Sequence, residues 1–203
     1  MLKANNISFS YHPSRLILNN IDLSIQPGEV VGVYGQSGVG KSTLANIMAG
    51  YLKPDKGTIS VDGKEYPLKG RNPVQLIGQH PEKAINPYWQ MKQVLEESGQ
   101  YSDEFLEELG ISKKWMHRFP SQLSGGELQR FCLARAIAPE TKYLIADEMT
   151  TMLDAIIQAQ IWHTVLQLVH NRQLGVLVIS HELPLMKQVC NRILNFEEIA
   201  GRM

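Results

Sequence analysis

The sequence lacks a net charge. It holds 20 Lys and Arg residues against 20 Asp and Glu residues, so its formal net charge at pH 7 is zero. This balance argues against a nucleic-acid-binding protein that works through bulk positive charge, and it leaves only a local basic groove for such a role. Hydrophobic residues make up 43% of the chain and charged residues 20%, a composition that excludes a wholly disordered chain.

Long hydrophobic runs and cysteines are also scarce. No apolar run approaches the roughly 18 residues that a membrane-spanning helix needs, and Met1–Asn6 lacks the apolar core of a signal peptide. We therefore expect a cytoplasmic protein that reaches a membrane only through a partner. Cys132 and Cys190 lie in apolar stretches with helical spacing, so we expect buried free thiols in a reducing compartment rather than a disulfide or a metal pair.

Short apolar runs alternate with helical patterns along most of the chain. Such alternation predicts a parallel sheet covered by helices. The stretch from Asn86 to about Trp115 is richer in Glu, Gln and Lys and has helix-like spacing, which predicts a small helical insertion. The expected strands are 7–11, 21–25, 30–34, 58–61, 143–146 and 176–179, and the expected helices are 44–48, 127–138, 155–170 and 185–190.

A glycine-rich segment after the strand at 30–34 matches the phosphate-binding pattern G-x-x-x-x-G-K-[ST] in full. Its glycines let the backbone turn successive N–H groups toward phosphate oxygens, and the following helix adds the positive end of its dipole. We expect Lys41 to reach the β- and γ-phosphates of a nucleotide, Ser42 to bind Mg²⁺, and Thr43 to hold the neighbouring phosphate. The segment consists of Gly35, Gln36, Ser37, Gly38, Val39, Gly40, Lys41, Ser42 and Thr43.

Two adjacent acids, Asp147 and Glu148, follow the apolar strand at 143–146. The carboxyl end of a strand is where open α/β sheets bind ligands. We expect Asp147 to hold Mg²⁺, directly or through water, and Glu148 to polarise a water for attack on the γ-phosphate. The phosphate loop alone is compatible with several classes of protein: kinases, GTPases, motor ATPases and transporters.

A second phosphate site is predicted some 80 residues beyond the first. Ser124 precedes an expected helix at about 127–138 and is a preferred N-cap residue, while two glycines leave backbone N–H groups open to an anion. One chain is not expected to fold both sites around one γ-phosphate. The candidate binding residues here are Ser124, Gly125, Gly126 and Glu127.

These motifs resemble those of ATP-binding cassette (ABC) ATPases. The run Leu123 to Arg130, reading LSGGELQR, is similar to the family signature, and the other motifs occur in the family's order. The resemblance implies a P-loop NTPase of the α/β class with a mostly parallel core sheet, an N-terminal antiparallel β subdomain and a small α-helical insertion. It implies one ABC ATPase domain over 1–203, with a helical subdomain at about 86–138 inserted in a RecA-like core.

The resemblance also implies roles for isolated residues. Tyr11 resembles the aromatic that stacks on adenine, and Gln79 resembles the glutamine that touches Mg²⁺ and the attacking water. His181 resembles the switch histidine that contacts the γ-phosphate and orients the water on Glu148, and Asp154 resembles a residue that bridges two protomers. Two cassettes are then expected to pair head to tail, with each signature closing on ATP held by the other's phosphate loop.

Finer features resemble the ATPases of oligopeptide, dipeptide and nickel importers, in particular Asn86-Pro87 after Gln79 and the run Gln158 to Ile161. The partners then implied are permease subunits, a second ATPase subunit that is the same or different, and a separate substrate-binding protein. A soluble ABC ATPase unconnected with transport and a non-hydrolysing regulatory cassette are the alternatives. Met149 and Met152 depart from the family pattern, in which Pro follows the catalytic Glu and a small residue precedes Leu-Asp.

The segment after Gln79 is expected to meet the permease. We predict that Tyr88, Trp89 and Met91 form an exposed aromatic and methionine-rich patch, since such residues are enriched at interfaces. The alternative is that Trp89 packs inside the small core of the helical insertion.

Overall fold

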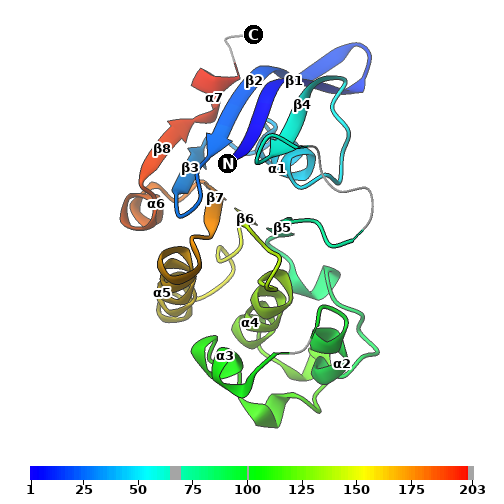
Figure 1. Ribbon diagram of the computed structural model, residues 1–203, viewed down its shortest axis with the longest axis vertical. Helices are drawn as coiled ribbons and strands as arrows, with labels where there is room; N and C mark the ends of the chain where they lie inside the picture. Colours follow the sequence, from blue (N-terminus) through cyan, green and yellow to red (C-terminus); the bar gives the residue numbers. More distant parts are fainter. Residues whose placement is uncertain (65–69, 100, 201–203) are drawn as a thin grey trace.

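Two β-sheets and a set of helices make up the computed structural model, which describes residues 1–64, 70–99 and 101–200 (Figure 1). The smaller sheet has the strand order β2-β1-β4 and the larger one has the order β5-β6-β7-β3-β8. Within the described ranges, none of the helices is both long enough and apolar enough to cross a membrane.

The smaller sheet is antiparallel and carries the N-terminus. β1 (Leu2–His12) pairs with β2 (Arg15–Ile25) through a tight hairpin and with β4 (Lys56–Val61) on its other edge. The strands expected at 7–11 and 21–25 are parts of these two longer strands. The expected N-terminal antiparallel β subdomain is confirmed.

The larger sheet is parallel throughout its described pairings. Because the strands run in one direction, the ends of β3, β6 and β7 share one edge, and the segments that follow them are Gly35–Gly40, Glu148 and His181. The expected mostly parallel core sheet is confirmed. Its strands are β3 (Val30–Tyr34), β5 (Val74–Ile77), β6 (Tyr143–Asp147), β7 (Gly175–Ser180) and β8 (Arg192–Asn195).

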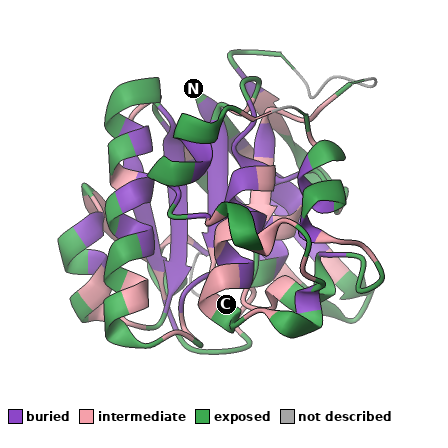
Figure 2. Cartoon of the chain, turned by 90° about the horizontal axis from the view of Figure 1, so that it is seen from below, coloured by how far each residue is buried: buried purple, intermediate pink, exposed green. Residues whose placement is uncertain are grey.

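Alternate residues of the central strands enter two different hydrophobic cores. Val30 of β3 belongs to one core, whereas Val31 and Val33 belong to the other. Side chains alternate between the faces of a strand, so each core covers one face of the parallel sheet. α1 (Lys41–Met48) and α7 (Phe196–Ile199) share a core with the antiparallel sheet, while α5 (Ala155–Arg172) and α6 (Leu183–Val189) cover the opposite face. Figure 2 shows the buried strands between helices whose outward faces are exposed.

Helical segments fill the chain between β5 and β6 and occupy the lower part of Figure 1. Met91, Leu95, Leu106 and Phe131 are buried in the same core as α5, α6 and one face of the parallel sheet. The segments are η1 (Pro81–Lys83), α2 (Met91–Glu96), α3 (Asp103–Glu108), η2 (Lys113–Trp115), η3 (Pro120–Gln122) and α4 (Gly125–Ala136).

The exposed patch expected after Gln79 is wrong in two of its three members. Tyr88 is 85% exposed, but Met91 is fully buried and Trp89 is half-buried against the core of the helical segments. Met91 is the first residue of α2, and its burial follows from the helix-like spacing of Met91, Val94 and Leu95. The alternative interpretation, in which Trp89 packs within the insertion, agrees better with the structure.

Both cysteines are free thiols, as expected, but only Cys132 is buried. Cys190 is half-buried and is the C-cap residue that follows α6. Burial raises the pKa of both thiols to about 12, so neither is a reactive thiolate at neutral pH.

Candidate active site

The phosphate-binding loop joins β3 to α1. Gly38 and Gly40 have φ values of +81° and +116°, which L-residues with side chains rarely adopt. A Cβ atom on Gly40 would also lie only 3.0 Å from Cγ2 of Ile17. The pattern therefore requires glycine at residue 40 both for backbone conformation and for close packing against β2.

Lys41 is held inside this loop. Its side chain is buried, and Nζ donates hydrogen bonds to the carbonyl oxygens of Gly35 at 2.8 Å and Gln36 at 2.6 Å. Burial lowers the pKa of Lys41, while the nearby carboxylates of Glu148 and Asp147 act in the opposite direction. The loop thus fixes the Lys41 ammonium group close enough to Asp147 and Glu148 to interact with their carboxylates.

Asp147 ends β6 with one oxygen unsatisfied. Oδ1 is buried and has no hydrogen-bond partner in the described part of the chain. Burial raises the pKa of Asp147, and Glu148 adds to this, whereas the Ser42 hydroxyl and Lys41 lower it. A buried carboxylate oxygen without a partner, beside a hydroxyl, is the oxygen donor set that Mg²⁺ takes, and a bound cation would favour the ionised carboxylate.

Glu148 has an unusual backbone. Its φ of +52° is rare for a residue with a side chain, and the surrounding contacts hold it there. Its N–H donates to the Ile179 carbonyl at 2.9 Å, and its own carbonyl accepts from the Thr151 hydroxyl at 3.1 Å. Oε1 lies 3.3 Å from Nδ1 of His181. The strand ends of β6 and β7 therefore bring a carboxylate and an imidazole together.

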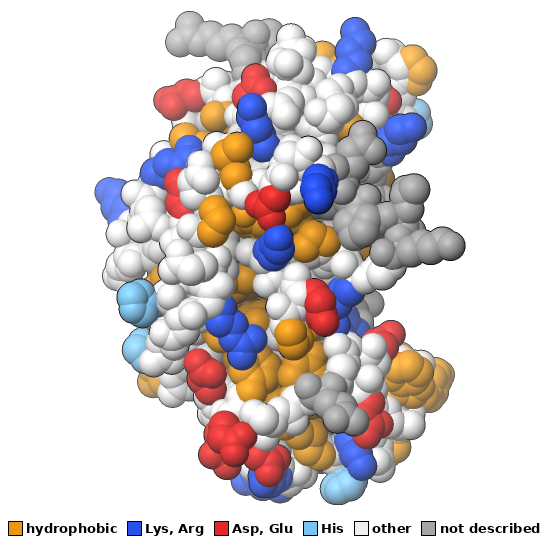
Figure 3. All heavy atoms as spheres, viewed as in Figure 1, with side chains coloured by type: hydrophobic (Ala, Val, Ile, Leu, Met, Phe, Trp, Pro, Cys, Tyr) orange, Lys and Arg blue, Asp and Glu red, His pale blue; other side chains and the backbone are white. Residues whose placement is uncertain are grey.

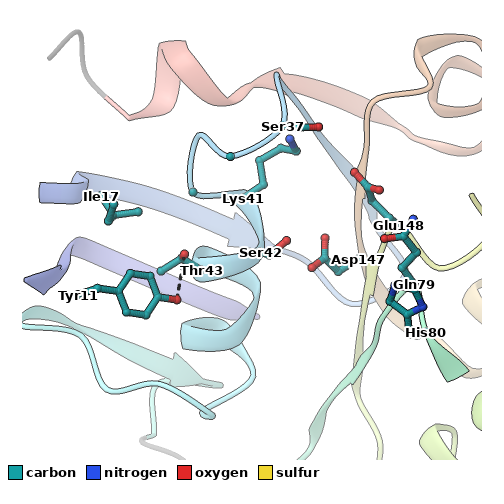
Figure 4. Close-up of a pocket in the computed structure, with 12 residues that line it drawn as sticks. Tyr11, Ile17, Ser37, Lys41, Ser42, Thr43, Gln79, His80, Asp147 and Glu148 are labelled. Carbon is teal, nitrogen blue, oxygen red and sulfur yellow. Dashed lines mark hydrogen bonds between the residues drawn. The ribbon is translucent and has the colours of Figure 1, made fainter. Parts of the chain in front are cut away.

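These residues meet in a cleft of about 500 Å³, which we call the phosphate-loop cleft (Figure 4). Lys41 and Ser42 face Asp147, Glu148 and Gln79 across it. At its outer end the Tyr11 hydroxyl hydrogen-bonds the Thr43 hydroxyl at 3.3 Å. The lining consists of Tyr11, Ile17, Ser37, Gly38, Gly40, Lys41, Ser42, Thr43, Gln79, His80, Asp147 and Glu148.

Most of the residues expected at this site line the cleft, and two that were not expected do so as well. Gly35, Gln36 and Val39 do not line the cleft: the first two accept hydrogen bonds from Lys41 through their carbonyls, and Val39 packs against the hydrophobic core. His181 joins through Glu148 rather than through the lining. Ile17 and His80 were missed, although the position of His80 directly after Gln79 was a usable signal.

The signature residues lie in a different cleft of about 600 Å³, which we call the signature cleft. Ser124, Gly126 and Glu127 line it together with Arg130 and Gln160, and the two linings share no residue. The expected second site is thus separate from the first within one chain.

The signature helix begins at Gly125, two residues earlier than expected, and ends at Ala136 rather than Ala138. Ser124 and Glu127 form a capping box: the Glu127 N–H donates to Ser124 Oγ at 3.3 Å, and the Ser124 N–H donates to Glu127 Oε2 at 2.8 Å. A Cβ on Gly126 would lie 2.7 Å from Cγ2 of Ile157, so close packing on α5 requires glycine there. Asp154 caps α5, accepting from the N–H groups of Ile156 and Ile157 at 3.0 Å.

A family model described as ABC transporter matches residues 18–151, more than half of the chain. The chain belongs to the ABC transporter family. It is an ATPase subunit of this family, as expected from the order of its motifs.

Curated relatives of this ABC ATPase include nickel import ATP-binding proteins NikE. The protein from Rhodospirillum rubrum is 32% identical, with 92% of this chain and 74% of that protein covered. The protein from Escherichia coli K12 is 33% identical, with 90% and 75% covered. Among solved structures, the dimeric bacterial ABC cassette MJ0796 has a TM-score of 0.80 at 25% identity, covering 96% of this chain and 94% of that one. It has also been solved in a post-hydrolysis state bound to ADP and Pi.

The two methionines that depart from the family pattern lie in different surroundings in this ABC ATPase. Met149 is buried, whereas Met152 is 61% exposed. Neither lines the phosphate-loop cleft. The departures therefore change the loop between β6 and α5 and not the lining of the cleft itself.

Proposed function

We propose that this ATPase binds Mg²⁺-ATP in the phosphate-loop cleft and powers the import of nickel, as a free ion or a chelate, through a membrane permease. Peptide import is the second candidate, because the Asn86-Pro87 and Gln158-to-Ile161 features resemble peptide importers as well as nickel importers. The nickel proposal rests on the NikE relatives, which match along nine-tenths of the chain. We further propose one domain over 1–203 with a helical subdomain at about 86–138.

In the proposed mechanism, the residues on each side of the cleft have different roles. The loop amides, Lys41 and Thr43 hold the phosphates, and Tyr11 stacks on adenine. Ser42, Asp147 and Gln79 would hold Mg²⁺, which when bound neutralises charge on the phosphates. Glu148 polarises the attacking water, and His181 orients that carboxylate from 3.3 Å. The observation that carries this proposal is the convergence of four separate segments on one cleft, which His181 joins through Glu148.

A second observation supports pairing of two chains. The signature residues line a separate cleft, so they need another molecule to contribute to the same nucleotide. The first turn of α4 offers backbone N–H groups and the positive end of a helix dipole to an anion. We propose that Ser124, Gly125, Gly126 and Glu127 of one chain close on ATP in the phosphate-loop cleft of a second ATPase subunit, which is the same chain or a sister chain.

The proposed partners follow from the import function. They are permease subunits that hold the ATPase at the cytoplasmic face of the membrane, and a separate protein that binds the cargo. We expect no nucleic-acid partner, and Figure 3 shows basic and acidic side chains interspersed on the face drawn there.

Head-to-tail pairing is tested by cross-linking. In the double variant Ser37→Cys/Ser124→Cys, mild oxidation with ATP should give a covalent dimer, and without ATP it should give little. Each single variant is the matched control, because Cys132 and Cys190 are present in all. A cross-link confined to one chain, or a dimer that forms equally without ATP, would contradict the pairing.

The cargo is tested by uptake in the source cells. Deletion of the gene should abolish high-affinity uptake of radioactive nickel, and the wild-type gene should restore it while the Glu148→Gln gene should not. Unchanged nickel uptake with loss of di- or oligopeptide uptake would favour the second candidate.

A further inference from the structure

His80 is the one residue, among the described residues that line the two cavities, that belongs to both the phosphate-loop cleft and a smaller cavity beside it. The smaller cavity lies between β5 and the signature helix α4, with Tyr51, Ile77, Cys132 and Arg135 in its lining. His80 therefore lies where the two cavities adjoin.

The ring is held from one side. Nδ1 of His80 lies 3.0 Å from Oε1 of Glu82, two residues along the chain. Because a carboxylate only accepts, Nδ1 carries the proton in this contact. The His80 carbonyl accepts from the Lys83 N–H at 3.1 Å, which closes the turn η1 under the ring. Backbone and side chain thus fix His80 together.

The turn that carries His80 rests on the signature helix. The Cys132 thiol of α4 points to the Pro81 carbonyl at a sulfur–oxygen distance of 3.8 Å. At its other end the turn continues directly into Gln79, and Figure 4 shows Gln79 and His80 next to each other on the side of the cleft that holds the two acids. Because Gln79 and His80 share a peptide bond, a shift of the anchored His80 backbone would also shift the backbone of Gln79.

We propose that His80 is a positioning residue: held by Glu82, it fixes the backbone that presents Gln79 to the place where Mg²⁺ and the attacking water would bind in the phosphate-loop cleft. This rests on the proposed role of Gln79. An isolated, solvent-exposed His–Glu pair would add little to stability and nothing to catalysis. This pair directly follows, in the chain, a residue that faces the acids, and this place gives it a positioning role.

The test compares His80→Ala, His80→Asn and a matched control, His117→Ala, which removes an exposed imidazole that lines neither cavity. ATP binding is measured at equilibrium with a fluorescent analogue, in EDTA and in Mg²⁺, and turnover is measured by phosphate release. In His80→Ala, affinity in EDTA should stay within about twofold. The gain in affinity from Mg²⁺ and kcat should each fall about tenfold, the scale seen when a group supporting a metal ligand is removed.

Rescue separates positioning from mere packing. Asn places a hydrogen-bonding atom near the position of Nδ1, so His80→Asn should recover most of the Mg²⁺-dependent gain. Glu82→Ala should resemble His80→Ala, and the double variant should be no worse than either, because both remove one contact.

Three results would overturn the inference: an unchanged Mg²⁺-dependent gain in His80→Ala, an equal loss of affinity in EDTA, or an Asn variant as poor as the Ala variant. Failure of the proposed function would look different. Glu148→Gln would then hydrolyse ATP at the wild-type rate, whatever the His80 variants do.

Discussion

Single residues in the phosphate-loop cleft are arranged so that opposite charges face each other before any ligand is considered. Lys41 donates to two loop carbonyls on one side, and Asp147 keeps a buried oxygen without a partner in the described chain on the other. Burial raises the pKa of Asp147 and lowers that of Lys41, so both charged forms are disfavoured by desolvation. Phosphate and a divalent cation would restore favourable partners to both, which is a physical reason to expect that the proposed nucleotide and its metal bind together.

Changing Lys41 to Ala tests the phosphate side. It removes an ammonium whose hydrogen bonds to charged groups contribute about 1.5–3 kcal/mol each. ATP affinity should therefore fall at least about tenfold, which isothermal titration would measure. Lys53→Ala, at an exposed lysine outside the cleft, is the control and should bind normally. An unchanged affinity in Lys41→Ala, with an intact fold by circular dichroism, would count against the phosphate-loop assignment.

Among the elements, the helical segments between β5 and β6 share the hydrophobic core that covers one face of the parallel sheet. Met91 is buried in this core, and Trp89 packs against it half-buried. The helices there are short, with six residues each in α2 and α3. Short helices gain little from propensity alone, so side-chain packing must stabilise them.

Trp89→Ala should consequently lower the free energy of unfolding by about 1–3 kcal/mol, somewhat less than truncation of a fully buried aromatic residue. Chemical denaturation followed by circular dichroism measures this. Tyr88→Ala is the matched control, because Tyr88 is 85% exposed and should change stability by less than about 0.5 kcal/mol. Equal stability of the Trp89 variant and wild type would return Trp89 to the interface interpretation.

The strands and motifs that the sequence predicted well are those with strong local signals. β3, β6 and β7 are apolar and buried on both faces, and the phosphate loop follows β3 with its full pattern. β5 and β8 were not predicted, because each has only four residues and includes polar side chains such as Gln75 and Arg192. β5 and β8 form because they pair with β6 and β3, which lie far from them in the sequence, and their composition alone does not predict this.

The site could be predicted to a similar extent. Motif residues such as Lys41, Asp147 and Glu148 were found because their spacing carries their chemistry. Ile17 was missed because it lies on β2, which is close to Gly40 only in the folded molecule. The sequence predicted Ser124 as an N-cap residue but not the capping box. The hydrogen bond from the Ser124 N–H to Glu127 depends on where the helix begins.

At the scale of the whole molecule, Asp62 ties together segments far apart in the chain. Its carboxylate accepts from Lys142 at 2.6 Å and from the amino group of Met1 at 2.6 Å. The Lys142 hydrogen bond, followed by that of the Met1 amino group, lowers the pKa of Asp62 to about 2. The groups are substantially exposed, so solvent screens their interaction and its effect on stability is small.

The sign of the pH dependence follows from the lowered pKa. The stabilising contribution is complete above the unfolded pKa of about 3.9 and is lost as pH falls through the folded value of about 2. Asp62→Asn should lower the free energy of unfolding at pH 7 by less than about 1 kcal/mol, and the difference from wild type should shrink on acidification and at high salt. Urea unfolding across pH measures it, and a difference that grows on acidification would contradict the linkage.

The most direct test of the catalytic proposal is ATP turnover by Glu148→Gln in a single-turnover assay with radiolabelled ATP. The variant keeps the shape of the side chain and loses the group that polarises water. Binding should stay within about twofold of wild type, while hydrolysis should slow by about 10²–10⁴-fold, the range for loss of a general base. Glu104→Gln, at an exposed glutamate of α3, should turn over normally. Wild-type turnover in Glu148→Gln would contradict the central claim that this carboxylate activates the attacking water.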